Sequence, residues 1–198
     1  MGLEASRGRH SGWATEVRIA NPPPALLVKY TEKEKRFFYD YAGFVLRIVQ
    51  DESVSDGIRR IISAENLRIE KQVDVRVMVF PARTLRGRTN RTLHGSYSRS
   101  ASQISLYPLK IPRDWAKNDG QDLFRTPYDS LTDRKKRLLY EISETAIATM
   151  IHEILHVKFE SRGLNSYAEE SIVRKLETNY MQGWESTISG SVRNVLLN

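Results

Sequence analysis

Residues 146–157 read Ala-Ile-Ala-Thr-Met-Ile-His-Glu-Ile-Leu-His-Val, a helical pattern in a chain of 198 residues. Only four of these positions are polar, namely Thr149, His152, Glu153 and His156. A helix that is apolar on nearly every side is buried in the middle of a fold. Helical spacing continues from about Leu131 to Glu160, and Gly163 is a stop signal. The sequence therefore predicts one long central helix.

The polar residues of this helix have the spacing of a metal site. His152 and His156 are four positions apart, so both imidazoles lie on one face and can bind the same ion. Glu153 is rotated away from that ligand set but can reach a water at the ion, where a general base is needed. Two imidazoles and a carboxylate are costly in an apolar helix unless a partner offsets their burial. A divalent cation supplies that partner.

A third protein ligand is expected, because catalytic zinc is usually held by three side chains. Downstream of His156 the chain has no histidine, aspartate or cysteine, which leaves the glutamates at positions 160, 169, 170, 177 and 185. Glu160 would lie about 12 Å from His152 along one helix axis, too far for a shared ion.

Glu169 is our first candidate for the third ligand. It precedes Ile172, Val173 and Leu176 by three, four and seven residues, so it shares their inward face of a helix predicted at 166–182. Glu170 is the second candidate, and His94 is a remoter upstream alternative.

The rest of the chain combines helical and strand patterns. Helices are predicted at about 31–50 and 55–65, a strand at 73–79, and a hairpin or bent edge strand within 95–107. Thr31 and Glu34 have the spacing of a capping box at the start of the first helix. Three prolines and a glycine mark residues 108–130 as a long loop rather than a regular element.

These elements predict an α+β fold in a single domain. A small mixed or antiparallel sheet would pack on the central helix that carries the histidines and on the following glutamate-bearing helix. Residues 1–24 are predicted to be an extended or disordered N-terminal tail, and 25–198 the domain. Within the domain we expect a helical part at 25–71, a core at 72–182 that holds the site, and a C-terminal tail at 183–198.

Composition limits the class of protein and of site. The chain has no cysteine, so disulfides and thiolate metal sites are excluded, and His and carboxylates must hold any metal. No apolar run reaches membrane-spanning length, and the first twenty residues lack the apolar core of a secretory signal. We therefore expect a cytoplasmic protein that does not span a membrane.

Positive charge is concentrated in one segment. The formal net charge is +7, and residues 75–113 contain eight basic residues and no acidic one. Such a segment is either a solvated face or a surface for an acidic partner or nucleic acid. The eight are Arg76, Arg83, Arg86, Arg88, Arg91, Arg99, Lys110 and Arg113.

The motif His152-Glu153-Ile154-Leu155-His156 and its setting resemble the gluzincin metallopeptidases, with the compact minigluzincins as the nearest type. The resemblance covers roughly residues 72–182, including the strand pair Gly-Ser-Tyr-Ser-Arg-Ser-Ala-Ser-Gln-Ile-Ser-Leu-Tyr at 95–107. It implies a Zn²⁺ held by His152, His156 and Glu169, with Glu153 as the base. It also implies that the strand Ile104–Tyr107 pairs with the backbone of a peptide substrate.

The expected function is hydrolysis of peptide bonds by a zinc-dependent metalloendopeptidase. Tyr167 is a candidate second donor to the oxyanion that forms at the scissile carbonyl. The alternative is a zinc-containing DNA-binding or regulatory protein with a peptidase-like fold and little general proteolysis. A further possibility is that one of the tails occupies the cleft and keeps the enzyme latent.

Overall fold

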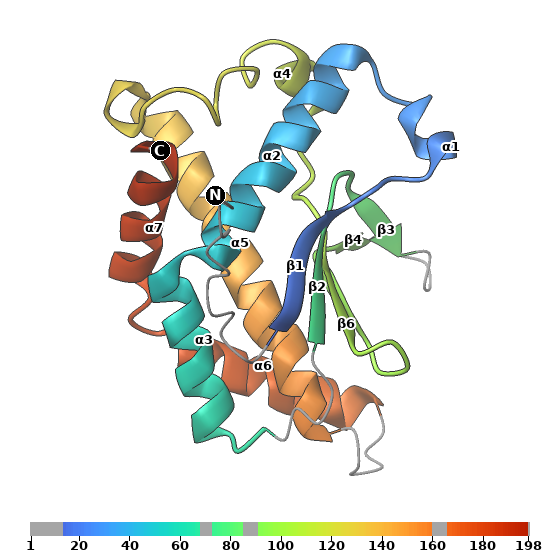
Figure 1. Cartoon of the computed structure of the whole chain (residues 1–198), viewed down its shortest axis with the longest axis vertical. Helices are drawn as coiled ribbons and strands as arrows, with labels where there is room; N and C mark the ends of the chain where they lie inside the picture. The colour runs from blue at the N-terminus through green and yellow to red at the C-terminus, as the bar shows by residue number, and fades with distance from the viewer. Residues whose placement is uncertain (1–13, 68–72, 85–90, 160–165, 198) are drawn as a thin grey trace, which may run out of the picture.

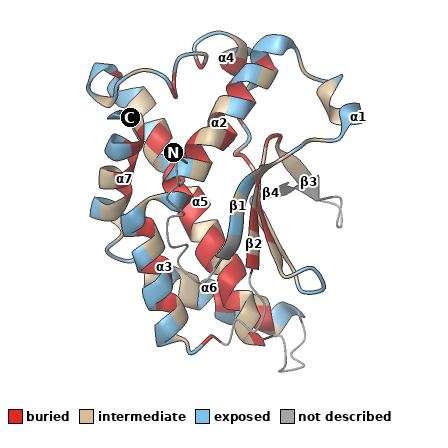
Figure 2. Ribbon diagram, viewed as in Figure 1, coloured by how far each residue is buried: buried red, intermediate tan, exposed pale blue. Residues whose placement is uncertain are grey.

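The computed structural model describes residues 14–67, 73–84, 91–159 and 166–197, and its centre is helix α5 (Asp133–His156). Thr132 caps this helix, since its hydroxyl accepts a hydrogen bond from the Lys135 amide. Ile147, Met150 and Ile151 are at most 1% exposed, and Figure 2 shows buried residues along most of α5. The predicted central helix is therefore confirmed. It ends at His156, where the 3-10 turn η2 (Val157–Phe159) follows.

Four strands form a mixed sheet in the order β1-β2-β6-β5. The strands are β1 (Ala14–Ala20), β2 (Val73–Met78), β5 (Gly95–Ser98) and β6 (Gln103–Leu106). Strand β2 runs parallel to both β1 and β6, whereas β5 and β6 are an antiparallel hairpin. A separate antiparallel pair is formed by β3 (Ala82–Thr84) and β4 (Arg91–Leu93).

Helices cover one face of this sheet. Helix α2 (Glu32–Gln50) packs on β1 and β2, and α5 packs on β5 and β6. Val73, Val75 and Val77 alternate with less buried residues along β2, which confirms the predicted half-buried strand. Beyond these helices lie α3 (Glu52–Ala64) and α7 (Glu185–Leu197), on the side away from the sheet (Figure 1). The protein is thus a single α+β domain, as predicted.

Two segments predicted as tails belong to the fold. Residues 14–20 form β1, because β2 offers them a free edge on which to pair. Helix α7 buries Ile188, Val192 and Val195 against the other helices, so the segment predicted as a C-terminal tail is a packed helix at 185–197. Of the residues assigned to the N-terminal tail, 1–13 lie outside the described part. Neither β1 nor α7 is free to occupy a cleft.

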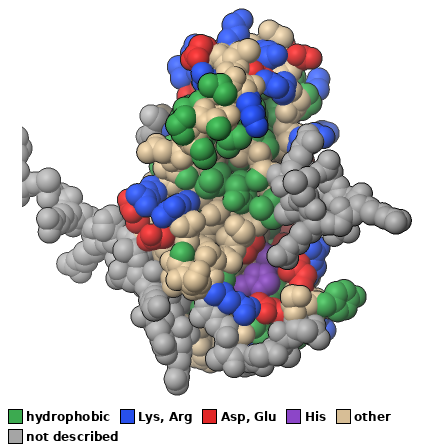
Figure 3. All heavy atoms as spheres, turned by 90° about the vertical axis from the view of Figure 1, so that its right-hand side faces the viewer, with side chains coloured by type: hydrophobic (Ala, Val, Ile, Leu, Met, Phe, Trp, Pro, Cys, Tyr) green, Lys and Arg blue, Asp and Glu red, His purple; other side chains and the backbone are tan. Residues whose placement is uncertain are grey.

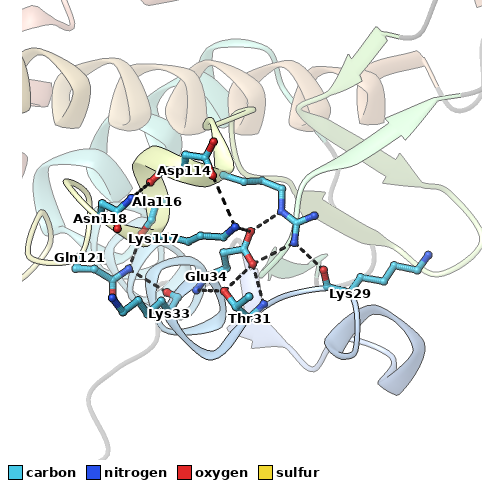
Figure 4. A network of polar contacts seen from close by, with 10 residues as sticks. Lys29, Thr31, Lys33, Glu34, Asp114, Ala116, Lys117, Asn118 and Gln121 are labelled. Atoms are coloured by element: carbon cyan, nitrogen blue, oxygen red, sulfur yellow. Dashed lines mark hydrogen bonds and ion pairs between the residues drawn. The ribbon is translucent and has the colours of Figure 1, made fainter.

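The segment 108–130 is irregular, as expected, but it contains the short helix α4 (Arg113–Lys117) and a 3-10 turn, η1 (Tyr128–Ser130). The predicted capping box is present, with the Thr31 amide donating to Glu34 at 2.7 Å. The same buried carboxylate accepts from Arg113 at 3.1 Å, and Lys117 lies 3.9 Å from it. Figure 4 shows this network, which holds α4 against the start of α2.

Two further helices complete the described structure. Helix α1 (Pro24–Leu27) is a single turn that precedes α2, and α6 (Ser166–Met181) packs against α5. In Figure 1, α6 lies across the C-terminal end of α5, where the histidines are. Among the described residues, every helix is too short or too polar to traverse a lipid bilayer.

Candidate metal centre

The two histidines of the motif lie at the C-terminal end of α5 and direct equivalent atoms at one point. Their Nε2 atoms are 3.2 Å apart, and both side chains are mostly buried, with 15% and 17% exposed. The i, i+4 spacing of the sequence thus produces the convergence that it predicts.

Glu170 at the start of α6 completes a group of three ligand atoms. Its Oε2 lies 3.4 Å from His152 Nε2 and 3.6 Å from His156 Nε2. Around a tetrahedral zinc ion, ligand atoms at normal bond lengths are about 3.4 Å apart. The three side chains therefore have the spacing that zinc needs, with no movement of either helix. The other oxygen of Glu170 accepts a hydrogen bond from Arg174 at 2.7 Å.

Carboxylates also support the far side of both imidazole rings. His152 Nδ1 donates to Glu177 at 2.7 Å, and His156 Nδ1 donates to Glu169 at 2.6 Å. A carboxylate on Nδ1 fixes the ring orientation and leaves the Nε2 lone pair free for a metal. This pattern is typical of histidines that bind zinc. It explains why the Nε2 atoms of both rings are directed at the same point.

The structure thus gives the two candidate glutamates different places. Glu169 faces inward, as predicted, and is 5% exposed, but there it meets His156 Nδ1 and the Arg99 guanidinium, at 2.6 Å and 2.7 Å. Glu170, our second candidate, lies with the two Nε2 atoms. The geometry therefore favours Glu170 as the third ligand and Glu169 as a positioning residue. Adjacent positions on α6 can both meet α5 because α6 crosses its end.

Glu153 is 7% exposed beside the two histidines. Burial raises its pKa to about 7, with the Glu170 and Glu177 charges adding to the rise; His152 and a hydrogen bond from the Tyr97 amide oppose it. Strand β5 passes very close to this carboxylate. A Cβ on Gly95 would lie 2.9 Å from Glu153 Oε1 and 2.3 Å from Thr149 Cγ2. Only glycine fits there, so the strand itself confines the proposed base.

The charges of this centre favour a cation. Four carboxylates (Glu153, Glu169, Glu170 and Glu177) face two guanidinium groups (Arg99 and Arg174) around the two imidazoles. Burial lowers the pKa of His152, but Glu177 and the other carboxylates raise it more, so it lies above its ordinary value. Figure 3 shows histidine and acidic side chains together on this face. The surplus of negative charge suits a divalent ion.

Comparison with protein-family models, curated proteins and solved structures found no match to this chain. The resemblance to gluzincins therefore depends on the motif and its surroundings alone. What the centre can do has to be judged from its own residues.

Other residues named from the sequence lie apart from the three ligand atoms. Tyr167 is at the first turn of α6 with 86% of its surface exposed, so no packing holds it over the histidines. The side chain of His94 is exposed and lines a groove along α5.

The strand expected to pair with substrate is in the wrong place for that role. Strand β6 lies between β2 and β5, so its backbone groups on both sides are used within the sheet. The edge strand at this end of the sheet is β5. The prediction for Ile104–Tyr107 is therefore wrong, because the alternating pattern of a strand does not reveal its position in a sheet.

The basic segment is less free than its composition indicates. Arg99 pairs with Glu169 and Arg113 with Glu34, so both are committed to internal contacts. Arg86 and Arg88 lie outside the described residues, as do the side chains of Arg83 and Arg91. Lys110 is exposed and lines the groove along α5.

Several residues of the centre were missed in the sequence. Two of these are Arg174 and the orienting role of Glu177; both residues follow our second candidate, Glu170, at four and seven positions on one helix, a spacing that could have identified a shared face. Gly95 and Arg99 belong to a distant hairpin, and no local signal connects them with residues 152–177.

Proposed function

We propose that this protein is a zinc-dependent metallopeptidase in which His152, His156 and Glu170 hold the ion and Glu153 is the general base. The triangle of Nε2, Nε2 and Oε2 atoms, with sides of 3.2, 3.4 and 3.6 Å, carries the proposal. Orienting carboxylates on both Nδ1 atoms support it. Two imidazoles and one carboxylate leave a coordination position for substrate or water, as catalytic zinc sites do.

The chemistry of hydrolysis is divided between the ion and the protein. When bound, zinc acts as a Lewis acid toward a carbonyl oxygen and lowers the pKa of water. Glu153 accepts the proton of the attacking water and then delivers it to the amine of the departing peptide fragment. The Tyr97 amide and the confinement by Gly95 hold the carboxylate against β5.

The position of β5 supports a peptide as substrate. It is the edge strand nearest Glu153, and an extended peptide binds such an edge through main-chain hydrogen bonds. This replaces β6 as the strand that we propose for substrate pairing.

The test is to measure metal content and cleavage on the same variants. We expect one zinc per wild-type chain by elemental analysis, which also separates zinc from Fe²⁺, an ion that two imidazoles and a carboxylate also suit. His152→Ala and Glu170→Gln should lose the metal. Glu153→Gln should keep it and lose at least about 100-fold in cleavage of an unstructured protein such as casein.

Two results would contradict the proposal. Folded wild-type protein that takes up no zinc after chelation and dialysis against zinc would remove the metal site. Equal cleavage by wild type and Glu153→Gln would rule out the proposed peptidase activity. In the second case zinc would have a structural role.

A further inference from the structure

A groove of about 1110 Å³ runs beside the N-terminal half of α5, away from the proposed metal ligands. One side is the segment 109–112 with α4, and the other is the first turns of α5. Ile111, Trp115 and Leu138 supply apolar surface to it. Figure 3 shows a band of hydrophobic side chains on this face, on the same side of the molecule as the histidines.

The wall formed by α4 is firmly held. Arg113 is bound to the buried Glu34 and to the carbonyl oxygen of Lys29 at 2.7 Å (Figure 4). Trp115 packs edge-on against Phe37, with ring centroids 5.8 Å apart. A Cβ on Gly120 would lie 2.6 Å from the Trp115 ring, so the chain closes tightly over the indole. The groove is therefore a preformed feature.

The rim of the groove is mainly positive. Lys110, Arg134, Lys135 and Arg137 line it, against two acidic residues, Asp119 and Glu141. Within the described part of the chain, the ion pairs involve none of these four cations. Three of the four lie in the first turns of α5, where the helix dipole disfavours positive charge. Their presence there is unfavourable for the helix but suits an anionic ligand.

The stripe of α5 that lines the groove continues toward the proposed metal ligands. Leu138, Glu141 and Thr145 line it, and Thr149 and His152 follow at the same helical spacing. From Leu138 to His152 the helix rises about 21 Å. An extended peptide spans that distance with about six residues. A polypeptide of this length that occupies the groove and passes alongside β5, which lies against Thr149, can therefore reach Glu153.

We propose that this groove binds an acidic stretch of the polypeptide substrate that also carries apolar side chains, about six residues from the bond that is cut. The inference rests on the proposed peptidase function and names the substrate class for it. Apolar side chains would contact Trp115 and Leu138, while carboxylates would face Arg134 and Arg137. The apolar floor favours a peptide over nucleic acid, whose backbone would need the cations alone. The chain's own first thirteen residues are basic and do not match the rim.

Binding is tested separately from cleavage. The probe is a fluorescein-labelled peptide of twelve residues that alternates Asp or Glu with Leu or Phe, bound to full-length Glu153→Gln and followed by anisotropy. A Lys-for-acid peptide and a single-stranded oligonucleotide of equal length are compared. We expect the acidic peptide to bind at least about tenfold more tightly than the Lys peptide. Arg134→Glu with Arg137→Glu should abolish that difference.

The matched control is Arg36→Glu with Arg60→Glu, which makes the same change of charge at exposed helix positions outside this groove. It should alter binding less than about twofold. Equal binding of the two peptides would overturn the inference. Tighter binding of the oligonucleotide, lost on the same charge reversal, would overturn it in favour of a nucleic-acid surface.

Cleavage separates this inference from the proposed function. We compare two peptides that share a neutral segment, one of which also carries the acidic stretch six residues away. Zinc-loaded wild type should cut the peptide with the acidic stretch at least about fivefold faster. Arg134→Glu with Arg137→Glu should remove this difference in rate. If wild type cuts both peptides at the same rate, the inference about the groove is wrong, but the proposed peptidase function stands. If the acidic peptide binds selectively but no peptide is cleaved, the proposed peptidase function is wrong and the groove is a docking site only.

Discussion

At Gly95, strand β5 passes against α5 with no room for a side chain. We predict that Gly95→Ala displaces Glu153, because the added Cβ would lie 2.3 Å from Thr149 Cγ2 and 2.9 Å from Glu153 Oε1. Overpacking of this kind costs about 1–3 kcal/mol. Zinc content should stay the same while peptide cleavage falls at least about tenfold.

The rescue variant makes this prediction specific. Thr149→Ser removes Cγ2, the atom nearest to the added Cβ, so Gly95→Ala with Thr149→Ser should recover part of the lost rate. Thr149→Ser alone is the control. If Gly95→Ala cleaves at the wild-type rate, the carboxylate is not confined by this strand.

Glu177 is not one of the three candidate ligands, but it holds the His152 ring. We predict that Glu177→Gln weakens zinc binding about 10- to 100-fold, as loss of an orienting carboxylate does in other zinc sites. Competition with a chromophoric chelator measures the affinity. Glu185→Gln, on the exposed start of α7, should change nothing. An unchanged affinity in Glu177→Gln would show that the ring needs no carboxylate to orient it.

At the scale of elements, the junction of α2 and α4 depends on one buried carboxylate. The Arg113 guanidinium, aided by hydrogen bonds from Thr31, lowers the pKa of Glu34 to about 2 despite its burial. A carboxyl whose pKa is lowered by folding stabilises the protein above its ordinary value of 4.5, and this stabilisation is lost as the pH falls toward 2.

We therefore predict that Glu34→Gln lowers the free energy of unfolding by about 2 kcal/mol at pH 7 and by much less near pH 2. This is less than the whole pKa shift would give, because Arg113 is half exposed and solvent screens the pair. Urea denaturation across this pH range measures it. Asp40→Asn breaks the more exposed pair with Arg125 and should cost under about 1 kcal/mol. A constant difference between Glu34→Gln and wild type from pH 7 to 2 would contradict the prediction.

At the scale of the whole molecule, the proposed metal ligands join two helices without being part of the hydrophobic core. His152 and His156 come from α5 and Glu170 from α6. The core residues of α5 are instead Ile147, Met150 and Ile151, which are buried. We predict that chelator-treated protein remains folded. Zinc at a hundredfold excess over its Kd should add about 2.7 kcal/mol of stability. For a domain of this size that raises Tm by roughly 5–10 °C.

Calorimetry with and without EDTA measures the shift, and amide exchange should locate the change in α6. His152→Ala is the control, since its Tm should not respond to zinc. Unfolding of the wild type on chelation would mean that the ion organises the core. A Tm that zinc does not move would mean that the ion does not bind.

Much of the architecture follows from local patterns. The apolar stretch at 146–157, the capping box at Thr31 and the alternation in β2 each predict an element that the structure contains. Residues 14–20 and 185–197 form a strand and a helix instead of the predicted tails, because their partners are distant in sequence. A short strand beside Pro-rich residues and a weakly apolar helix become stable only when β2 and α5 offer surfaces to them.

The site divides in the same way. The convergence of His152 and His156, with Glu153 beside them, was evident in the sequence because one helix with 3.6 residues per turn fixes their relation. The sequence does not decide between Glu169 and Glu170 as the third ligand, because the angle at which α6 crosses α5 determines which histidine nitrogens each carboxylate meets. Arg99 and Gly95 depend on how the β5–β6 hairpin lies over that helix. Relations within an element are set by backbone geometry, whereas relations between elements are set by how their buried faces pack.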